Sequence, residues 1–346
     1  MKRFVLILVL LFGLTFPANA MELTVPEVPD GADALMPAEE SSFTDGLLHV
    51  FTTAFAALQP EIAGCIKTCG VLFACAVALS LLSTFQGMSA KTLTMASVAV
   101  CACILLTPAQ TLIRSGVETV TDISQYGKLL LPVMATALAS QGGSTSSAAL
   151  YAGTAVFDSI LSMVFSNLLI PMVYVYLAVG ILCAATGMDA LKKGKDLVLW
   201  FIHWSMKTLM YIFTGYLTVT GVIGGATDQM ALKATKVTLS SAVPVVGGIL
   251  SDASETILVS AGMVKNSVGV WGLISIAAIV ISPFLKIGVQ YLFLKASAAL
   301  CGLFGGKAYT ELIGDFASAM GLLLAMTGAV CLLFVVSTIC FMKGMG

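Results

Sequence analysis

Charged side chains are scarce in this 346-residue chain, in which Asp, Glu, Lys and Arg make up 10% of the residues, against roughly 25% in an ordinary soluble domain. A chain of this kind cannot cover its surface with polar groups. Hydrophobic residues make up 58% of it, so we predict that the lipid bilayer is its solvent. The 17 basic and 18 acidic residues give a formal net charge of -1, which supplies no basic field to attract nucleic acid.

Motifs for catalysis and metal binding are also missing from the sequence. It has no GxxxxGK[ST] phosphate loop, HExxH zinc pair or GxSxG nucleophile elbow, and its only histidines are His49 and His203. The nine cysteines lie in or beside apolar runs without the spacing of a zinc site, and are interpreted as small packing residues. We therefore predict no enzymatic activity, no cofactor and no metal site.

The first twenty residues have the features of a secretory signal peptide. Lys2 and Arg3 precede a short apolar run, and Ala18 and Ala20 form a small-x-small cleavage site. The alternative is an uncleaved first helix, but about eleven apolar residues are short for a span of roughly 20. Cleavage would leave residues 21–60 at the start of the mature chain, where acidic residues and prolines predict a flexible extracytoplasmic tether.

Six apolar runs long enough to span a bilayer follow. They cover residues 62–85, 93–113, 155–185, 197–223, 268–300 and 316–342. The third run is predicted to be one long, kinked span, with two tight spans as the alternative. Lys192, Lys193 and Lys195 precede the fourth run and predict a cytoplasmic loop. The predicted fold class is thus all-α, a polytopic transmembrane helical bundle over residues 61–346.

Two shorter apolar segments carry Pro132 and Pro244. They are predicted to be re-entrant or interfacial, since about ten residues cannot span as a helix. An offset of 112 residues superposes Pro132 on Pro244 and Pro171 on Pro283. This spacing predicts an internal repeat, with copies at 128–239 and 240–346, unless it arises by chance. Two spans separate corresponding points, so the copies are expected to be parallel.

Ionisable groups in the predicted spans are the first functional candidates, because holding a charge in hydrocarbon costs roughly 2.5 to 3.5 kcal/mol. Lys286 is expected to face the bundle interior, a partner carboxylate or a neighbouring protein, and a purely structural ion pair is the alternative. The candidate functional or packing residues are Pro132, Asp158, Pro171, Asp228, Pro244, Gly247, Asp252, Lys265, Gly269, Pro283 and Lys286.

The most distinctive polar stretch runs from Asp228 to Gly272. It contains Lys233 and Lys236, then Ser240-Ser241-Ala242-Val243-Pro244-Val245-Val246-Gly247, Ser251-Asp252-Ala253 and Lys265-Asn266-Ser267-Val268-Gly269-Val270-Trp271-Gly272. These residues resemble the stage III sporulation protein AE family. The resemblance covers the chain from the signal peptide to the last helix.

The resemblance implies a non-enzymatic integral membrane component of the secretion-like channel apparatus that joins the mother cell and the engulfed forespore of endospore-forming bacteria. It implies a location in the mother-cell membrane around the forespore. The implied partners are membrane lipid, other stage III sporulation membrane proteins, a secretion-type ATPase and ring-forming channel proteins. The residues themselves leave a second function open, a secondary transporter or permease for a small solute, which the repeat, the proline-broken helices and Lys286 suggest.

Overall fold

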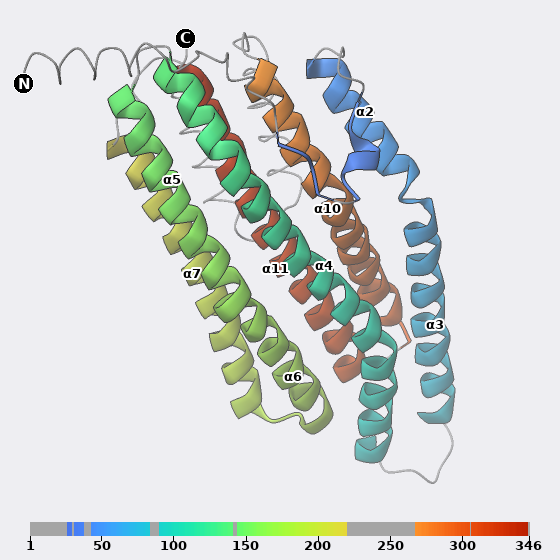
Figure 1. The fold of residues 1–346 in the computed structure, drawn as a ribbon. Helices are drawn as coiled ribbons and strands as arrows, with labels where there is room; N and C mark the ends of the chain where they lie inside the picture. Colours follow the sequence, from blue (N-terminus) through green and yellow to red (C-terminus); the bar gives the residue numbers. More distant parts are fainter. Residues whose placement is uncertain are drawn as a thin grey trace, which may run out of the picture.

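The computed structural model describes residues 26–29, 31–37, 43–83, 90–140, 144–219, 267–304 and 306–344, and within these ranges the regular elements are all helical (Figure 1). The elements are η1 (Asp33–Leu35), α2 (Phe43–Ala56), α3 (Gln59–Ser83), α4 (Ala90–Ser140), α5 (Ser144–Val164), η2 (Phe165–Leu169), α6 (Ile170–Thr186), α7 (Asp189–Val219), α10 (Ser267–Cys301) and α11 (Lys307–Gly344). Six helical stretches in the described part are long and apolar enough to cross a membrane. The predicted all-α bundle with about six spans is confirmed.

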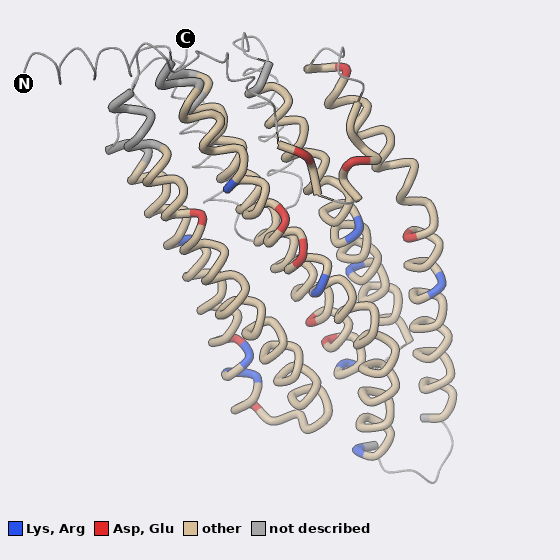
Figure 2. Tube along the Cα trace, viewed as in Figure 1, with Lys and Arg blue, Asp and Glu red and all other residues tan. Residues whose placement is uncertain are grey.

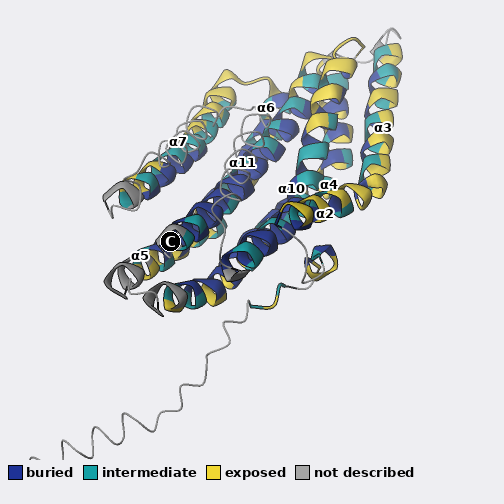
Figure 3. Cartoon of the chain, turned by 90° about the horizontal axis from the view of Figure 1, so that it is seen from above, coloured by how far each residue is buried: buried dark blue, intermediate teal, exposed yellow. Residues whose placement is uncertain are grey.

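The long helices run side by side, and α11 lies at the centre of the bundle (Figures 1 and 3). It packs on α10, α4, α6, α5 and α7 and is the most buried of the six stretches. Helices α3 and α7 lie at opposite edges, and α3 is the least buried. Apolar side chains therefore cover most of α11 on all sides, whereas α3 packs against the bundle along one face only.

The prediction of a separate short segment at Pro132 is wrong. Residues 129–138 are the end of α4, a 51-residue helix that contains both Pro108 and Pro132. A proline removes one backbone hydrogen bond from a helix, and neighbouring helices in a bundle can support the freed backbone group. The matching segment around Pro244 lies outside the described residues.

Helix α4 continues past the predicted end of its span because its polar stretch is amphipathic. Ile113, Val120 and Ile123 are buried, while Glu118 and Asp122 lie on another side of the helix, where they line a cavity. Apolar residues at helical spacing keep one face packed while charges occupy another. The charges interrupt the apolar run in the sequence without interrupting the helix.

The third predicted span is confirmed as one continuous stretch, Tyr151–Thr186, made of α5, η2 and α6. Pro171 stands at the start of α6, directly after the π-helical turn η2. Proline cannot donate the hydrogen bond of a regular helical turn, and π turns commonly absorb such a local mismatch. Gly187 then ends α6 with a left-handed φ of 69°, and its N–H donates to the Cys183 carbonyl at 2.8 Å.

The described helices of the two predicted copies follow one another in the same order. Pro171 and Pro283 both lie in long helices that run in the same direction in Figure 1, and each is followed by an antiparallel neighbour, α7 or α11. This is the arrangement that a parallel duplication predicts. The duplication itself stays a prediction, because Pro244 lies outside the described residues.

The predicted flexible tether differs from the structure over its described part. Ala32 and Leu35 are buried, and α2 packs against α10. Val50 and Ala54 of α2 are also buried, and their four-residue spacing gives the helix one apolar face. Part of this acidic segment therefore belongs to the bundle. The predicted signal peptide, with Ala18 and Ala20, lies outside the described residues.

Candidate functional site

Helix α10 carries a row of polar side chains in an otherwise apolar sequence. Ser275, Ser282, Lys286, Gln290 and Ser297 follow one another at intervals of seven, four, four and seven residues, which places them on one side of an α-helix. We call this row the α10 polar face. Helices α4 and α3 both pack against α10, so this polar face lies along the contacts between helices.

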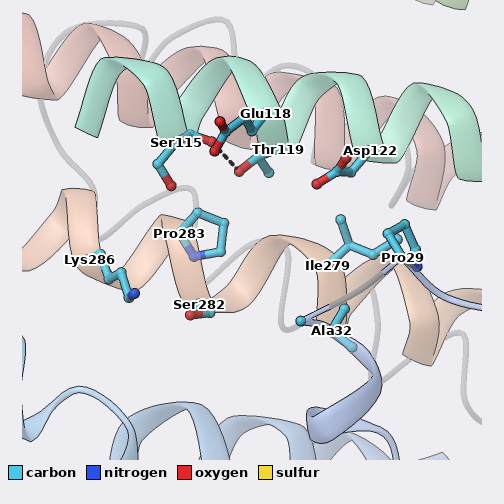
Figure 4. Close-up of a pocket in the computed structure, with 12 residues that line it drawn as sticks. Pro29, Ala32, Ser115, Glu118, Thr119, Asp122, Ile279, Ser282, Pro283 and Lys286 are labelled. Atoms are coloured by element: carbon cyan, nitrogen blue, oxygen red, sulfur yellow. Dashed lines mark hydrogen bonds between the residues drawn. The ribbon is translucent and has the colours of Figure 1, made fainter. Parts of the chain in front are cut away.

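A cavity of about 280 Å³ lies along this face, between α10 and α4 (Figure 4). Its third side is formed by the segment that precedes α2. The lining residues are Ser115, Glu118, Thr119 and Asp122 of α4, Ala278, Ile279, Ser282, Pro283 and Lys286 of α10, and Pro29, Gly31 and Ala32. Two of the predicted candidates, Pro283 and Lys286, thus meet at one site.

Two of the charged side chains on the cavity wall have partners. Lys286 Nζ lies 3.2 Å from Glu61 Oε1 of α3, and a partner carboxylate is one of the alternatives that the sequence left open for this lysine. Arg114 Nε donates to Glu118 Oε1 at 2.9 Å. Asp122 makes no ion pair or hydrogen bond within the part of the chain that the structure describes, and it lies beside Ile279 and Pro29 (Figure 4).

Two buried hydroxyl groups lie deeper between the same two helices. Gly272 of α10 contacts Leu130 of α4, which fixes the antiparallel register of the two helices and places Tyr126 opposite Ser275. Both side chains are buried, and the Ser275 hydroxyl faces the Tyr126 hydroxyl across this interface. They lie one helical turn beyond Asp122 and Ile279 on the same faces of α4 and α10.

The other end of the α10 polar face binds α3. Cys65 Sγ donates to Gln290 Oε1 at 2.8 Å, and Ser297 Oγ donates to Cys69 Sγ at 2.7 Å. The two thiols are therefore hydrogen-bonding partners in a helix interface as well as small packing residues. Without such partners, the buried amide of Gln290 would be left unsatisfied at a cost of about 1–3 kcal/mol.

A second polar cluster joins α6, α7 and α11 on the opposite side of the bundle. Lys195 Nζ donates to both carboxylate oxygens of Asp315 at 2.8 Å, and the Tyr176 hydroxyl donates to Asp315 Oδ1 at 3.1 Å. The two charged side chains are only 13% and 11% exposed. A Cβ atom at Gly180 would lie 3.1 Å from Asp315 Oδ2, so a small residue there leaves room for the carboxylate.

The predicted cytoplasmic loop with three lysines is the beginning of α7 in the structure. Lys192 and Lys193 are exposed, whereas Lys195 turns inward to Asp315. The chain between α6 and α7 is only Gly187 and Met188. One lysine of the cluster therefore serves packing between helices, and the other two remain available as topogenic charges.

The remaining candidates do not gather at the cavity. Asp158 is buried between α5 and α4, where its carboxylate accepts a hydrogen bond from Ser124 Oγ at 2.9 Å. Gly269 allows α10 to approach α11, because a Cβ there would lie 2.5 Å from Met342 Cγ. Candidates outside the described residues are Asp228, Pro244, Gly247, Asp252 and Lys265.

Sequence reasoning missed Glu61, Asp122 and Asp315. Asp315 stands just before the last apolar run, and its partner Lys195 is 120 residues away in the sequence. Asp122 lies between two predicted apolar runs, outside either of them. The spacing of Ser115, Asp122 and Tyr126 at helical intervals was the one sequence signal that could have identified the polar side of α4.

The six apolar stretches, the central α11 and the polar cavity between α4 and α10 define a polytopic α-helical membrane protein. The family model described as stage III sporulation protein AE matches residues 38–346, and the chain belongs to this family. It is also similar to "Stage III sporulation protein AE" of Bacillus subtilis (strain 168), with 23% identity over 199 residues.

That alignment covers 57% of this chain and 50% of the relative, so the matched part spans about half of the relative's length. No solved structure matches the chain.

Proposed function

We propose that the protein is a non-enzymatic, membrane-spanning component of the secretion-like channel apparatus between mother cell and forespore in endospore formation. The observation that carries this proposal is the family match over residues 38–346, which includes all six apolar stretches. Its location would be the mother-cell membrane around the forespore. Its partners would be other stage III sporulation membrane proteins, a secretion-type ATPase and ring-forming channel proteins.

The two edges of the bundle support a role in an assembly. Helix α3 exposes Leu81 and Leu82, and α7 exposes Leu197, Trp200 and Trp204. Apolar side chains of this kind suit lipid or the helices of neighbouring subunits equally well. Two separate apolar edges would let one chain contact two neighbours in the plane of the membrane.

A second candidate function is a permease for a small solute. The cavity between α4 and α10 favours it, since transporters bind solutes between helices that proline or glycine interrupts, and Pro283 lines this cavity. The two functions are compatible, because a channel apparatus can contain a subunit with its own solute site.

The first test is genetic and biochemical. In a spore-forming host that carries this chain, deletion is expected to abolish heat-resistant spores, and a tagged wild-type copy is expected to restore them. Purification of the tagged protein in mild detergent from sporulating cells should recover the ATPase and ring-forming proteins, identified by mass spectrometry. A tagged, unrelated six-span protein of the same cells is the control.

Normal spore formation by the deletion strain would contradict the proposed function. If the protein is purified in a folded state and no other sporulation protein is recovered with it, the proposed assembly is contradicted. If the purified protein moves a solute across liposome membranes without partners, the permease function is favoured over a scaffold.

A further inference from the structure

The exposed side of α4 changes its chemistry along the helix. Near the beginning of the helix, Met95, Val100 and Leu106 are exposed. Figure 2 shows that α4 carries no charge between Lys91 and Arg114, and that its other charges follow from there. Every exposed residue between positions 110 and 128 is polar or charged, namely Gln110, Thr111, Arg114, Glu118, Thr121, Gln125 and Lys128.

These seven residues form one continuous surface, which we call the outer polar face of α4. They follow one another at intervals of one to four residues, and residues three or four apart are neighbours on one side of an α-helix. The face rises by about 27 Å at 1.5 Å per residue, which is close to the thickness of the hydrocarbon core of a bilayer, about 30 Å.

At the level of this face, helix α5 exposes apolar side chains. Ser124 of α4, which precedes Gln125, donates a hydrogen bond to the Asp158 carboxylate of α5 at 2.9 Å. Val156 and Ile160, each two residues from Asp158, point away from α4 and are exposed. They belong to the third of the six apolar stretches. One side of the bundle therefore suits lipid at this level, whereas the outer polar face of α4 does not, because charged groups in hydrocarbon are costly.

The ion pair on the outer polar face favours water as its neighbour. Arg114 Nε donates to Glu118 Oε1 at 2.9 Å, and the two side chains are 82% and 59% exposed. Covering such a pair with another protein removes its water, which often costs more than the attraction between the charges returns. Water solvates both charges without this cost. Glu118 also lines the cavity between α4 and α10, so the face and the cavity form one polar surface.

We propose that the outer polar face of α4 lines an aqueous path within the depth of the membrane. This inference rests on the proposed channel function, because other subunits of the apparatus would complete the wall and keep lipid from this side of the bundle. The path extends along the part of α4 beyond Leu106, since the exposed side chains before that point are apolar.

The test is the reactivity of single cysteines in membranes from sporulating cells, fragmented so that a reagent reaches both surfaces. Thr121→Cys and Gln125→Cys probe the outer polar face, and Val156→Cys and Ile160→Cys are matched controls at the same level. Each is made in a variant that lacks the nine native cysteines and is treated with a charged, membrane-impermeant methanethiosulfonate. The two probes are expected to react about tenfold faster or more than the controls, because the thiolate is the reactive form and a thiol in lipid stays protonated.

The proposal is overturned if Thr121→Cys and Gln125→Cys react no faster than the controls. Slow reaction at all four positions would mean that lipid or another protein covers the outer polar face. Fast reaction at all four would mean that this level of the bundle lies outside the membrane. Both results leave the proposed function standing, because that function is tested separately by spore formation in the deletion strain.

Two arginine substitutions in the protein with its native cysteines serve if the cysteine-free variant does not fold. Thr121→Arg is expected to accumulate in the membrane at the level of the wild type, because water solvates the new charge. Ile160→Arg is expected to be largely lost from the membrane, because lipid does not solvate it. Immunoblots of the tagged proteins measure both amounts. Equal loss of the two variants, or equal accumulation, overturns the proposal.

Discussion

Asp315→Ala is expected to destabilise the protein by about 3–5 kcal/mol, because it leaves the Lys195 ammonium buried without a counter-charge. Asp315 receives two hydrogen bonds from Lys195 and one from Tyr176. Its removal therefore breaks contacts among α6, α7 and α11 at once. Denaturation of the purified protein in mixed micelles, followed by circular dichroism, measures the change in the free energy of unfolding.

Glu311→Ala is the matched control for this effect. Glu311 lies one turn earlier on α11 and pairs with Lys307 at 4.0 Å on the surface, where an ion pair contributes about 0–1 kcal/mol. The double variant Lys195→Met with Asp315→Leu is expected to regain much of the lost stability, since apolar replacement of a buried pair is often neutral. The ion pair has no structural role if Asp315→Ala costs no more than Glu311→Ala.

Gly127→Ala is expected to lower stability, although the same change usually stabilises a helix. The ring of the buried Phe334 occupies the place of an added Cβ atom, with Cε1 and Cζ in contact. Overpacking of this kind costs about 1–3 kcal/mol, against a gain of about 1 kcal/mol from the helical preference of alanine. The rigid ring cannot move aside without disturbing the packing of α4 on α11.

Gly116→Ala on the same helix provides the control. The nearest atom to its added Cβ is Leu323 Cδ2 at 3.8 Å, an ordinary contact, so Tm is expected to stay unchanged or rise. In Gly127→Ala, Tm is expected to fall, and Phe334→Leu in that background should recover part of the loss. Equal shifts of the same sign for both glycines would mean that α4 and α11 are not packed as described.

The number of spans could be predicted from the sequence because each span needs its own long apolar run. A run of about 20 apolar residues is visible without knowledge of its neighbours, and the long third stretch with Pro171 was identified in the same way. The sequence also marked Lys286 as a charge within a span, and a partner carboxylate was one of the surroundings expected for it. In each case the information lies within one helix.

The pairs that join distant helices could not be predicted in this way. Lys195 and Asp315 are 120 residues apart, and Cys65 and Gln290 are 225 apart. Either residue alone is only a polar group near an apolar run. The partner is fixed by the order and register in which helices pack, which periodicity within one helix does not contain.

The length of α4 was underestimated for a related reason. The sequence predicted a span that ends at residue 113 and a separate short segment at Pro132. In an isolated helix, an interior proline removes one backbone hydrogen bond and commonly breaks the helix. Here α4 packs on α11, α5 and α10. Its apolar side chains, such as Ile113 and Ile123, are buried, while Glu118 and Asp122 line the cavity.

The six-crossing arrangement is tested most directly by the sidedness of three single cysteines in intact cells. Met188, Leu303 and Leu48 are exposed, and each is replaced by cysteine in a variant that lacks the nine native cysteines and labelled with a membrane-impermeant maleimide. Met188→Cys and Leu303→Cys, at the α6–α7 and α10–α11 turns, are expected to label only after permeabilisation. Leu48→Cys, on α2, is expected to label in intact cells. Labelling of Met188→Cys and Leu303→Cys from opposite sides of the membrane would contradict the six-crossing bundle.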